Sequence, residues 1–391
     1  MKMHIHIGGE TERMVELCDV TLREGEQTPG AVFDLQDKLE LAGRLDNLGI
    51  AQIQVSFPGL DAQRLDEAKA VCSLPLRCKT EVMTNGMAED WRERIAAACA
   101  CGPDIVHSMV DARAACVSAA ARRKALAHVK EICDEVHAAG KLCNISFIGA
   151  FDADREGLIG LIRGIVCCAD RLRVADSYGI ATPEDVYAMV SAMAEARGGQ
   201  PSALGLHCHD DMGLAMANML AGVRAGADFV DVSINGLGSR AGNVPLATCA
   251  YVLDRVYHLS SGIDLTKLRE LSQRTGELCG ISVPPRTALV GEQVFDEEID
   301  IHVLELLNHA ERRGLRPETV GGEAHALYGK LTTAQVLHSV AQCRARDLTE
   351  NRIPAILASL RDYSLSHRGE VLDEEGLWDI VDEIQKNEIE P

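Results

Sequence analysis

Residues 171–209 read RLRVADSYGIATPEDVYAMVSAMAEARGGQPSALGLHCH, and this stretch decides the fold. It begins with a candidate strand, Arg171–Asp176, and ends with another, Ala203–His209. Between them, Pro183–Ala196 has helical spacing and starts with a proline, which the first turn of a helix tolerates. A strand, a helix and a second strand in this order indicate a βαβ unit with parallel strands.

The same alternation extends in both directions along the chain. We expect eight strands, and they are Val15–Leu22, Ile50–Phe57, Arg77–Thr84, Asp104–Val110, Lys141–Ile148, Arg171–Asp176, Ala203–His209 and Asp228–Ile234. Helical spacing recurs between them, as in Leu35–Leu48 and Ala119–Ala139, and Gly49, Gly140 and Gly226 occupy expected helix C-caps. Eight βα units predict an α/β fold of the TIM (β/α)8 barrel type. An open doubly wound sheet is the alternative, which the absence of G-x-G-x-x-G after the first strand disfavours.

The pattern changes near residue 260. Helical segments follow without strong strands, and they are Leu265–Cys279, Ile301–Arg313, Thr333–Arg344 and most of 350–391. We therefore predict a barrel domain at 12–262 and a mostly helical C-terminal region at 263–391. The latter is a candidate lid or dimerisation element.

Composition excludes several classes of protein. The 391 residues carry a formal net charge of −20, which disfavours nucleic-acid binding because that needs a basic surface. No stretch approaches the roughly 20 apolar residues of a membrane span, and the N-terminal residues do not resemble a signal peptide. The 14 cysteines are scattered without a Cys-x-x-Cys pair, which indicates buried thiols in a reducing cytoplasm rather than a zinc ribbon.

Polar clusters follow three of the expected strands, at the barrel end where function is found. The first is the run Asp19–Gln27, which a solvated loop would also explain. The second contains His207 and His209, which point to the same face of a strand because side chains alternate. The third is the Gly-rich run Asn235–Asn243, after strand eight, where barrels often bind anions; a flexible connector is the other interpretation.

The three clusters converge, because strands one, seven and eight are neighbours in a closed barrel. Glu24, His207 and His209 would then supply one oxygen and two nitrogens to a divalent cation, with open positions for water or a chelating substrate. Mixed nitrogen and oxygen ligands admit Zn, Mn, Fe or Co, and Mg with water.

The run Thr21–Gln27 (TLREGEQ), His207-x-His209 and the Gly236–Asn243 loop together resemble the DRE-TIM metallolyase superfamily. Within it, the chain is most similar to the homocitrate synthase and isopropylmalate synthase branch, over roughly residues 16–302.

The resemblance implies roles for further residues. Asn243 would lie beside the metal as a ligand or water partner, and Arg23 would stabilise an enolate oxygen. Gln27 would contact substrate. His302 would reach the active site from the C-terminal region, often that of a partner subunit, which implies a homodimer.

The implied reaction is a metal-dependent Claisen-type condensation. An acyl-CoA, expected to be acetyl-CoA, would condense with a small 2-oxo acid to give a 2-hydroxy-dicarboxylate and CoA. This is the acyltransferase chemistry of biosynthetic enzymes of the homocitrate synthase and isopropylmalate synthase type. The substrate carboxylates would meet Ser177, Gly238 and Arg240.

Several positions depart from the family pattern. The glutamate usual on strand two is Gln54, whose amide cannot take up a proton, so Gln54 would orient groups and His302 is the candidate base. Ser177 replaces a threonine and keeps the hydroxyl. The Ser-x-Glu pattern expected on strand five is Ser146-Phe147-Ile148. The metal end of the site therefore matches the family, whereas the substrate end is rebuilt.

Two other functions stay open at this point. One is a metal-dependent lyase or aldolase of the same superfamily, of the hydroxymethylglutaryl-CoA lyase type. The cysteine that such lyases carry in the Gly-rich loop is absent from residues 236–243. The other is a metal-binding paralogue with little catalysis, which Gln54 would explain.

Overall fold

The computed structural model describes residues 13–309 and 314–386, which form two compact units, Met1–Val283 and Pro284–Pro391. In the first unit, eight parallel strands close into a barrel in chain order. The strands are β1 (Glu16–Asp19), β2 (Gln52–Ser56), β3 (Lys79–Thr84), β4 (Ile105–Asp111), β5 (Leu142–Ile148), β6 (Arg171–Asp176), β7 (Ala203–Cys208) and β8 (Phe229–Val232). The (β/α)8 fold expected from the sequence is confirmed.

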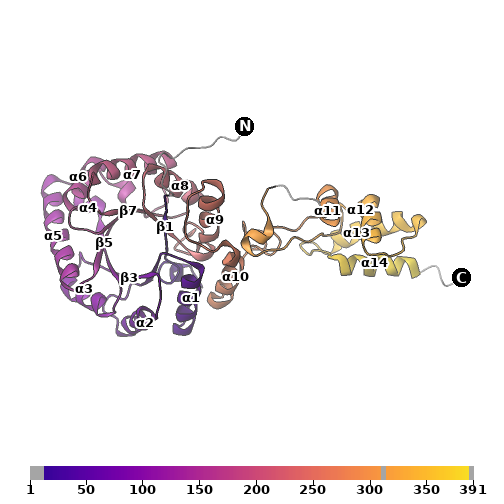
Figure 1. Cartoon of the computed structure of the whole chain (residues 1–391), viewed down its shortest axis with the longest axis horizontal. Helices are drawn as coiled ribbons and strands as arrows, with labels where there is room; N and C mark the ends of the chain where they lie inside the picture. Colours follow the sequence, from indigo (N-terminus) through magenta and orange to yellow (C-terminus); the bar gives the residue numbers. More distant parts are fainter. Residues whose placement is uncertain (1–12, 310–313, 387–391) are drawn as a thin grey trace. The chain divides into compact units, whose positions relative to one another are not determined.

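Helices surround this ring of strands (Figure 1). They are α1 (Leu35–Leu48), α2 (Ala62–Cys72), α3 (Trp91–Ala100), α4 (Ala112–Cys116), α5 (Ala119–Ala138), α6 (Arg155–Ile165), α7 (Pro183–Arg197), α8 (Ala215–Ala225), α9 (Leu246–Tyr251) and α10 (Leu268–Cys279). Their apolar faces and the outward residues of the strands make the main core.

Local signals in the sequence explain where helices begin and end. Thr182 caps α7 by accepting a hydrogen bond from the Asp185 backbone, and Asp185 reciprocates in a capping box. Helix α1 ends at Gly49, which adopts φ 98°, a left-handed conformation that glycine reaches without steric cost.

The lower end of the barrel, where the strands begin, is filled by an aromatic ring. Phe229 occupies the space beside Gly205, where an added Cβ would lie 2.1 Å from the ring. The Arg171 guanidinium stacks 3.8 Å from the ring centroid and pairs with Glu16 at 2.8 Å. These side chains close the barrel from below.

The middle of the barrel is polar, with Glu81 at its centre. One Glu81 oxygen lies 3.2 Å from Arg173 Nη1 and 3.1 Å from His107 Nδ1. The other accepts a hydrogen bond of 2.6 Å from Asn144, and Gln54 also donates to Glu81. Burial alone would raise the pKa of Glu81, but Arg173 and His107 hold it well below its usual range, so a full negative charge is buried here.

A series of ion pairs runs from Glu81 at the barrel centre to the barrel mouth, where the strands end. Arg173 pairs with Asp231 at 3.0 Å, and the second Asp231 oxygen lies 2.9 Å from His207 Nδ1. The sequence analysis did not predict this interior network. Each of its members comes from a different strand, so no single stretch of the sequence shows the pattern.

The second unit has a core of its own, which contains Tyr328, Val340, Leu360 and Trp378. Its helices are α11 (Asp300–Leu307), α12 (Ala334–Cys343), α13 (Ile353–Ser366) and α14 (Glu374–Lys386). Residues 310–313 of the expected helix Ile301–Arg313 lie outside the described residues. The units divide after Val283 rather than at the expected 262/263 boundary, because α10 packs on α1 and α9 and so belongs with the barrel.

All 14 cysteines lie in the part of the chain that the structure describes, and none of them forms a disulfide. Burial raises the pKa of thiols such as Cys72 and Cys78 to about 12, so these groups are protonated and unreactive at neutral pH. In residues 13–309 and 314–386, no helix has the length and apolar character that a membrane crossing requires.

Asp19, the last residue of β1, generates a prediction about pH. Its buried carboxyl accepts hydrogen bonds from the Thr21 backbone at 2.9 Å and hydroxyl at 3.0 Å, yet burial raises its pKa to about 7. The folded chain therefore keeps a proton that the unfolded chain releases near pH 4. Stability should fall by about 1.4 kcal/mol per pH unit from this group as the pH rises between those values.

Asp19→Asn should remove that dependence. The measurement is the free energy of unfolding in urea from pH 4.5 to 8, for the parent and the variant, with a metal chelator present. The free energy of unfolding of the variant, relative to that of the parent, should increase as the pH rises and level off above pH 7. Parallel curves would show that Asp19 ionises normally.

Candidate active site

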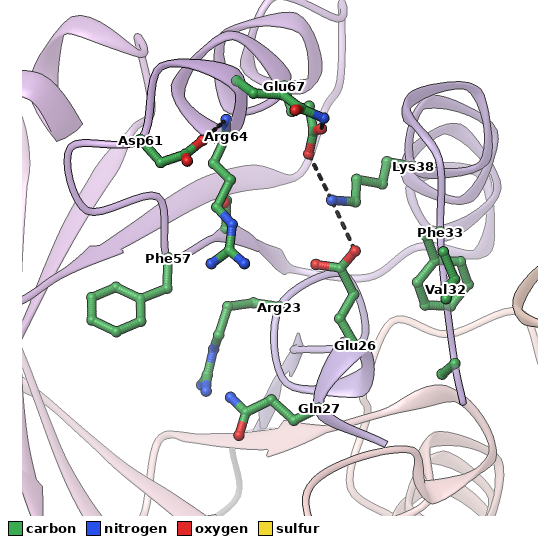
Figure 2. A pocket seen from close by; sticks show the side chains of 13 residues that line it. Arg23, Glu26, Gln27, Val32, Phe33, Lys38, Phe57, Asp61, Arg64 and Glu67 are labelled. Atoms are coloured by element: carbon green, nitrogen blue, oxygen red, sulfur yellow. Dashed lines mark hydrogen bonds and ion pairs between the residues drawn. The ribbon is translucent and has the colours of Figure 1, made fainter. Parts of the chain in front are cut away.

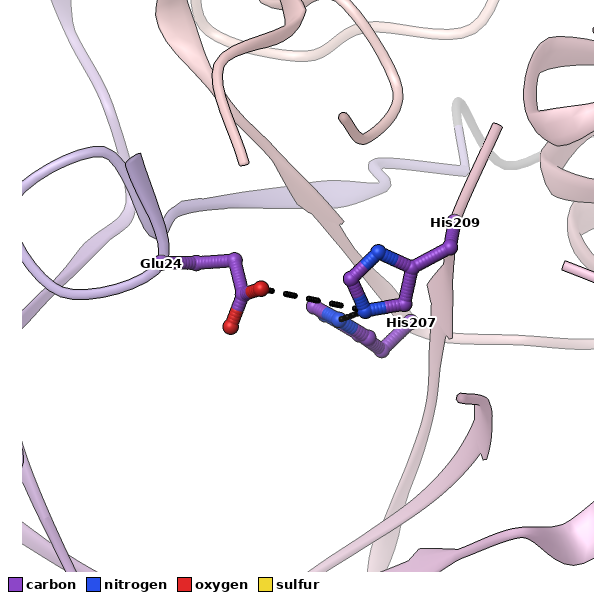
Figure 3. Close-up of side chains that lie close together, drawn as sticks. All are labelled: Glu24, His207 and His209. Carbon is purple, nitrogen blue, oxygen red and sulfur yellow. Dashed lines mark hydrogen bonds and ion pairs between the residues drawn. The ribbon is translucent and has the colours of Figure 1, made fainter. Parts of the chain in front are cut away.

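Three potential metal ligands meet at the mouth of the barrel (Figure 3). Glu24 precedes a short 3-10 turn after β1, His207 lies on β7, and His209 follows that strand. The Nε2 atoms of the two histidines are 3.3 Å apart, and His209 Nε2 is 3.8 Å from Glu24 Oε1. One ligand atom from each residue lies within 4.8 Å of the others, so a single cation can reach all three. We call these three residues the metal cluster.

The protonation states of these three side chains favour the binding of a cation. Asp231 accepts from His207 Nδ1, which leaves the Nε2 lone pair directed at the cluster. Burial, and then His207, lower the pKa of His209 to about 4, so its imidazole is neutral. Burial opposes ionisation of Glu24, but the Arg23 guanidinium beside it keeps the pKa of this carboxyl below its usual value. Two facing nitrogens and one carboxylate fit a divalent metal.

Asn243 lies next to this cluster, since it forms an antiparallel bridge with His209. Its Nδ2 donates to the Leu237 carbonyl at 3.2 Å, whereas its buried Oδ1 has no hydrogen-bond partner among the described residues. Gly238 makes room for this amide, because an added Cβ would lie 2.2 Å from Asn243 Nδ2. The free Oδ1 is available to a ligand or to its water.

Arg23 and Gln27 converge on the same carboxylate. Arg23 donates to Glu24 and to the Gln54 carbonyl oxygen, and Gln27 Nε2 lies 3.1 Å from Glu24 Oε2. Gln54 also contacts His107 Nδ1 at 3.0 Å and so ties Arg23 to the interior network. The guanidinium is thereby fixed beside the metal cluster.

Ser177 and Arg240, both expected to bind substrate, already have protein partners. Arg240 forms an ion pair with Asp211 at 2.7 Å and donates to the Ser177 carbonyl at 2.8 Å. The Ser177 hydroxyl accepts from the Gly149 backbone at 2.9 Å. A substrate carboxylate would have to replace or share these contacts.

His302 belongs to α11 of the second unit. Its side chain is about half exposed, at 49%, and its Nδ1 lies 3.2 Å from Glu305. Its approach to the metal cluster stays a prediction.

A cavity of about 590 Å³ adjoins the cluster (Figure 2). Arg23 and Gln27 line it, and both of them donate to Glu24 of the cluster. Lys38 crosses its far side and bonds Glu26 and Glu67, both at 2.9 Å. The remaining lining residues are Ala31, Val32, Phe33, Ser56, Phe57, Asp61, Gln63 and Arg64.

Comparison with known proteins identifies relatives. A family model described as HMGL-like matches residues 14–274, more than half of the chain. The chain is 31% identical to "2-isopropylmalate synthase 2" of Caldanaerobacter subterraneus subsp. tengcongensis, over 96% of this chain and 97% of that protein. It is 29% identical to "Homocitrate synthase 1" of Nostoc sp., over 92% and 95% of the two chains.

Solved structures support the fold. The hydroxymethylglutaryl-CoA lyase of Pseudomonas aeruginosa superposes with a TM-score of 0.58 at 20% identity, over 69% of this chain and 95% of that one. At this identity, the likeness concerns the barrel alone.

We predict that His207→Ala and His209→Ala abolish metal retention, because each removes one of only two nitrogen ligands. Metal content after dialysis, measured by elemental analysis, and titration calorimetry with Zn and Mn provide the test. His137→Ala is a matched control, since His137 is a surface histidine on α5 that pairs with Asp170. Unchanged metal affinity in His207→Ala would mean that the site is misassigned.

Proposed function

Because this chain belongs to the HMGL-like family, we propose that it condenses an acyl-CoA, expected to be acetyl-CoA, with a small 2-oxo acid. The products would be a 2-hydroxy-dicarboxylate and CoA. The observation that carries the proposal is the meeting of Glu24, His207 and His209 at the barrel mouth, with Arg23 beside them. Relatives named as synthases match over almost the whole chain, which supports this direction of reaction.

A divalent cation bound there would polarise the keto group of the 2-oxo acid. Glu24, His207 and His209 would hold it, with Asn243 as a fourth ligand or a water partner. Zn, Mn, Mg and Co are the candidates, and the identity of the metal belongs to this proposal.

Arg23 is proposed to stabilise the enolate oxygen that forms when the acyl-CoA loses a methyl proton. A fixed guanidinium in a water-poor site stabilises developing negative charge strongly. Its contacts with Glu24 and Gln54 hold it in place before the reaction begins. Gln27, Gly238, Ser177 and Arg240 would contact the substrates, the last two by exchanging their present partners.

The base is proposed to be His302. Gln54 occupies the position where a carboxylate would be expected, and an amide has no basic site at neutral pH. The Gln54 amide is already used by Glu81, His107 and Arg23. Gln54 therefore positions Arg23 rather than moving a proton.

The cavity beside Arg23 is the proposed place for the acyl-CoA. It adjoins the guanidinium that would meet the thioester oxygen, and Phe33 and Phe57 give it apolar surface. Arg64 lies at its exposed rim, where a phosphate would be solvated and paired.

The central test measures thiol release from acetyl-CoA with a panel of 2-oxo acids. We expect release that needs both substrates and the metal, and Arg23→Ala should retain metal while lowering kcat at least about 100-fold. Arg197→Ala is the control, because it removes an arginine that pairs with Asp228 away from the mouth. Cleavage of a single hydroxy acid or its CoA ester would instead indicate a lyase, and metal binding without either activity would indicate a paralogue with little catalysis.

His302 has a test of its own. His302→Gln should lower kcat by about 100-fold or more, as expected for loss of a general base, and leave metal content unchanged. His338→Gln serves as the control, since it changes another exposed histidine of the second unit. Normal turnover in His302→Gln would remove this residue from the mechanism.

A homodimer and a cytoplasmic location are further predictions from the sequence. Sedimentation of the purified chain would test the first. Mixing inactive His302→Gln with inactive Arg23→Ala protein would also test it, because shared sites would restore activity.

A further inference from the structure

We infer that the 2-oxo acid used by this chain is a monocarboxylic acid with a short aliphatic side chain. The side chain would lie against an apolar wall on β3 to β6, formed by Met83, Met109, Ile148 and Ala175. This inference rests on the proposed condensation and specifies its substrate. It excludes 2-oxo-dicarboxylic acids as preferred substrates.

The direction of these side chains follows from strand alternation. Glu81, His107 and Asn144 point into the barrel, because they bond one another across it. Residues two positions further along a strand point the same way and lie nearer the mouth. Met83 on β3 and Met109 on β4 therefore lie directly above the polar layer.

Two residues continue the wall towards the metal cluster. Ile148 stands four positions beyond Asn144 on β5 and thus on the same face. Ala175 on β6 pairs in register with His207, so it is the immediate neighbour of a metal ligand. Met83 and Ala175 are buried, at 7% and 5% exposure, whereas Met109 and Ile148 are partly accessible at the mouth.

The charged groups near the wall favour a monocarboxylic acid over a dicarboxylic one. The substrate carboxylate next to the keto group would be held at the metal cluster, but a second carboxylate would need a cation of its own. The guanidinium groups inside the barrel are already committed: Arg173 pairs with Glu81 and Asp231, and Arg171 pairs with Glu16. Arg23 is bound to Glu24.

The polar groups next to the wall, which include Ser146 between Asn144 and Ile148 on β5, supply no positive charge either. The His107 Nε2 atom lies 2.7 Å from the Ser146 hydroxyl, and burial lowers the pKa of His107, so the imidazole is neutral. Arg240 lies beyond the β6 end of the wall, where it pairs with Asp211 and donates to the Ser177 carbonyl from the loop after β8, and not beside β3 to β5. A second carboxylate directed at β3 to β5 would be buried without a counter-ion, which is unfavourable.

The test compares kcat/KM for pyruvate, 2-oxobutyrate and 2-oxoisovalerate with values for oxaloacetate and 2-oxoglutarate, by thiol release from acetyl-CoA. We expect the best monocarboxylic acid to exceed both dicarboxylic acids by at least about 100-fold, the scale expected for one unpaired buried charge. Binding of each acid to the metal-loaded protein, measured by calorimetry, should follow the same order.

A charge introduced into the wall should shift this preference. Ile148→Arg should improve 2-oxoglutarate by about 10-fold or more relative to the best monocarboxylic acid, because it supplies the missing cation. Leu142→Arg is the matched control: it places the same charge on the same face of β5, at the opposite end of the strand, where Leu142 is 37% exposed. Met109→Lys is a second test should Ile148→Arg fail to fold.

The outcomes separate the inference from the proposed function. Thiol release that is equal or faster with the dicarboxylic acids would overturn the inference and leave the condensation standing. An unchanged preference in both folded wall variants would also overturn the assignment of the wall. Absence of thiol release with every 2-oxo acid would overturn the proposed function and this inference with it.

Discussion

The buried carboxylate of Glu81 is the constraint on which the rest of the barrel depends. Its charge is balanced by Arg173, which also binds Asp231, and Asp231 in turn orients His207. Removing one partner from such a pair costs roughly 3–5 kcal/mol, because the remaining charge stays buried. The metal cluster is therefore the outer end of a rigid chain of charges that begins at the barrel centre. This connection links the stability of the fold to the geometry of the site.

The sequence predicted those parts of the molecule that follow from local patterns and from closure of the barrel. All eight strands are present, and the convergence of Glu24 with His207 and His209 follows because β1 and β7 both border β8. The Glu81 network was missed, because alternation in a strand does not reveal which face points inward when both faces are buried. The division after Val283 was also missed, since helical spacing in α10 does not say on which unit the helix packs.

The role of Gln54 follows from its contacts in the structure and could not be predicted from the sequence. Taken alone, an amide in place of a carboxylate indicates lost acid–base chemistry. In the structure, Gln54 uses its oxygen for Arg23 and its nitrogen for Glu81, which a carboxylate could not do beside another buried carboxylate. The amide is thus the residue type that allows the negative charge to reside on β3. The departure from the family pattern and the interior network have the same physical origin.

The ring of Phe229 against Gly205, with Arg171 stacked upon it, blocks the end of the barrel opposite the metal cluster. Under the proposed function, a reactant held against the strands would therefore enter and leave at the end with the metal ligands. Such a reactant would have to enter before any larger partner covers it, and it would be released only after that partner has departed. Under the proposed function, the plug of the barrel would thereby impose an order of events on the reaction at the far end.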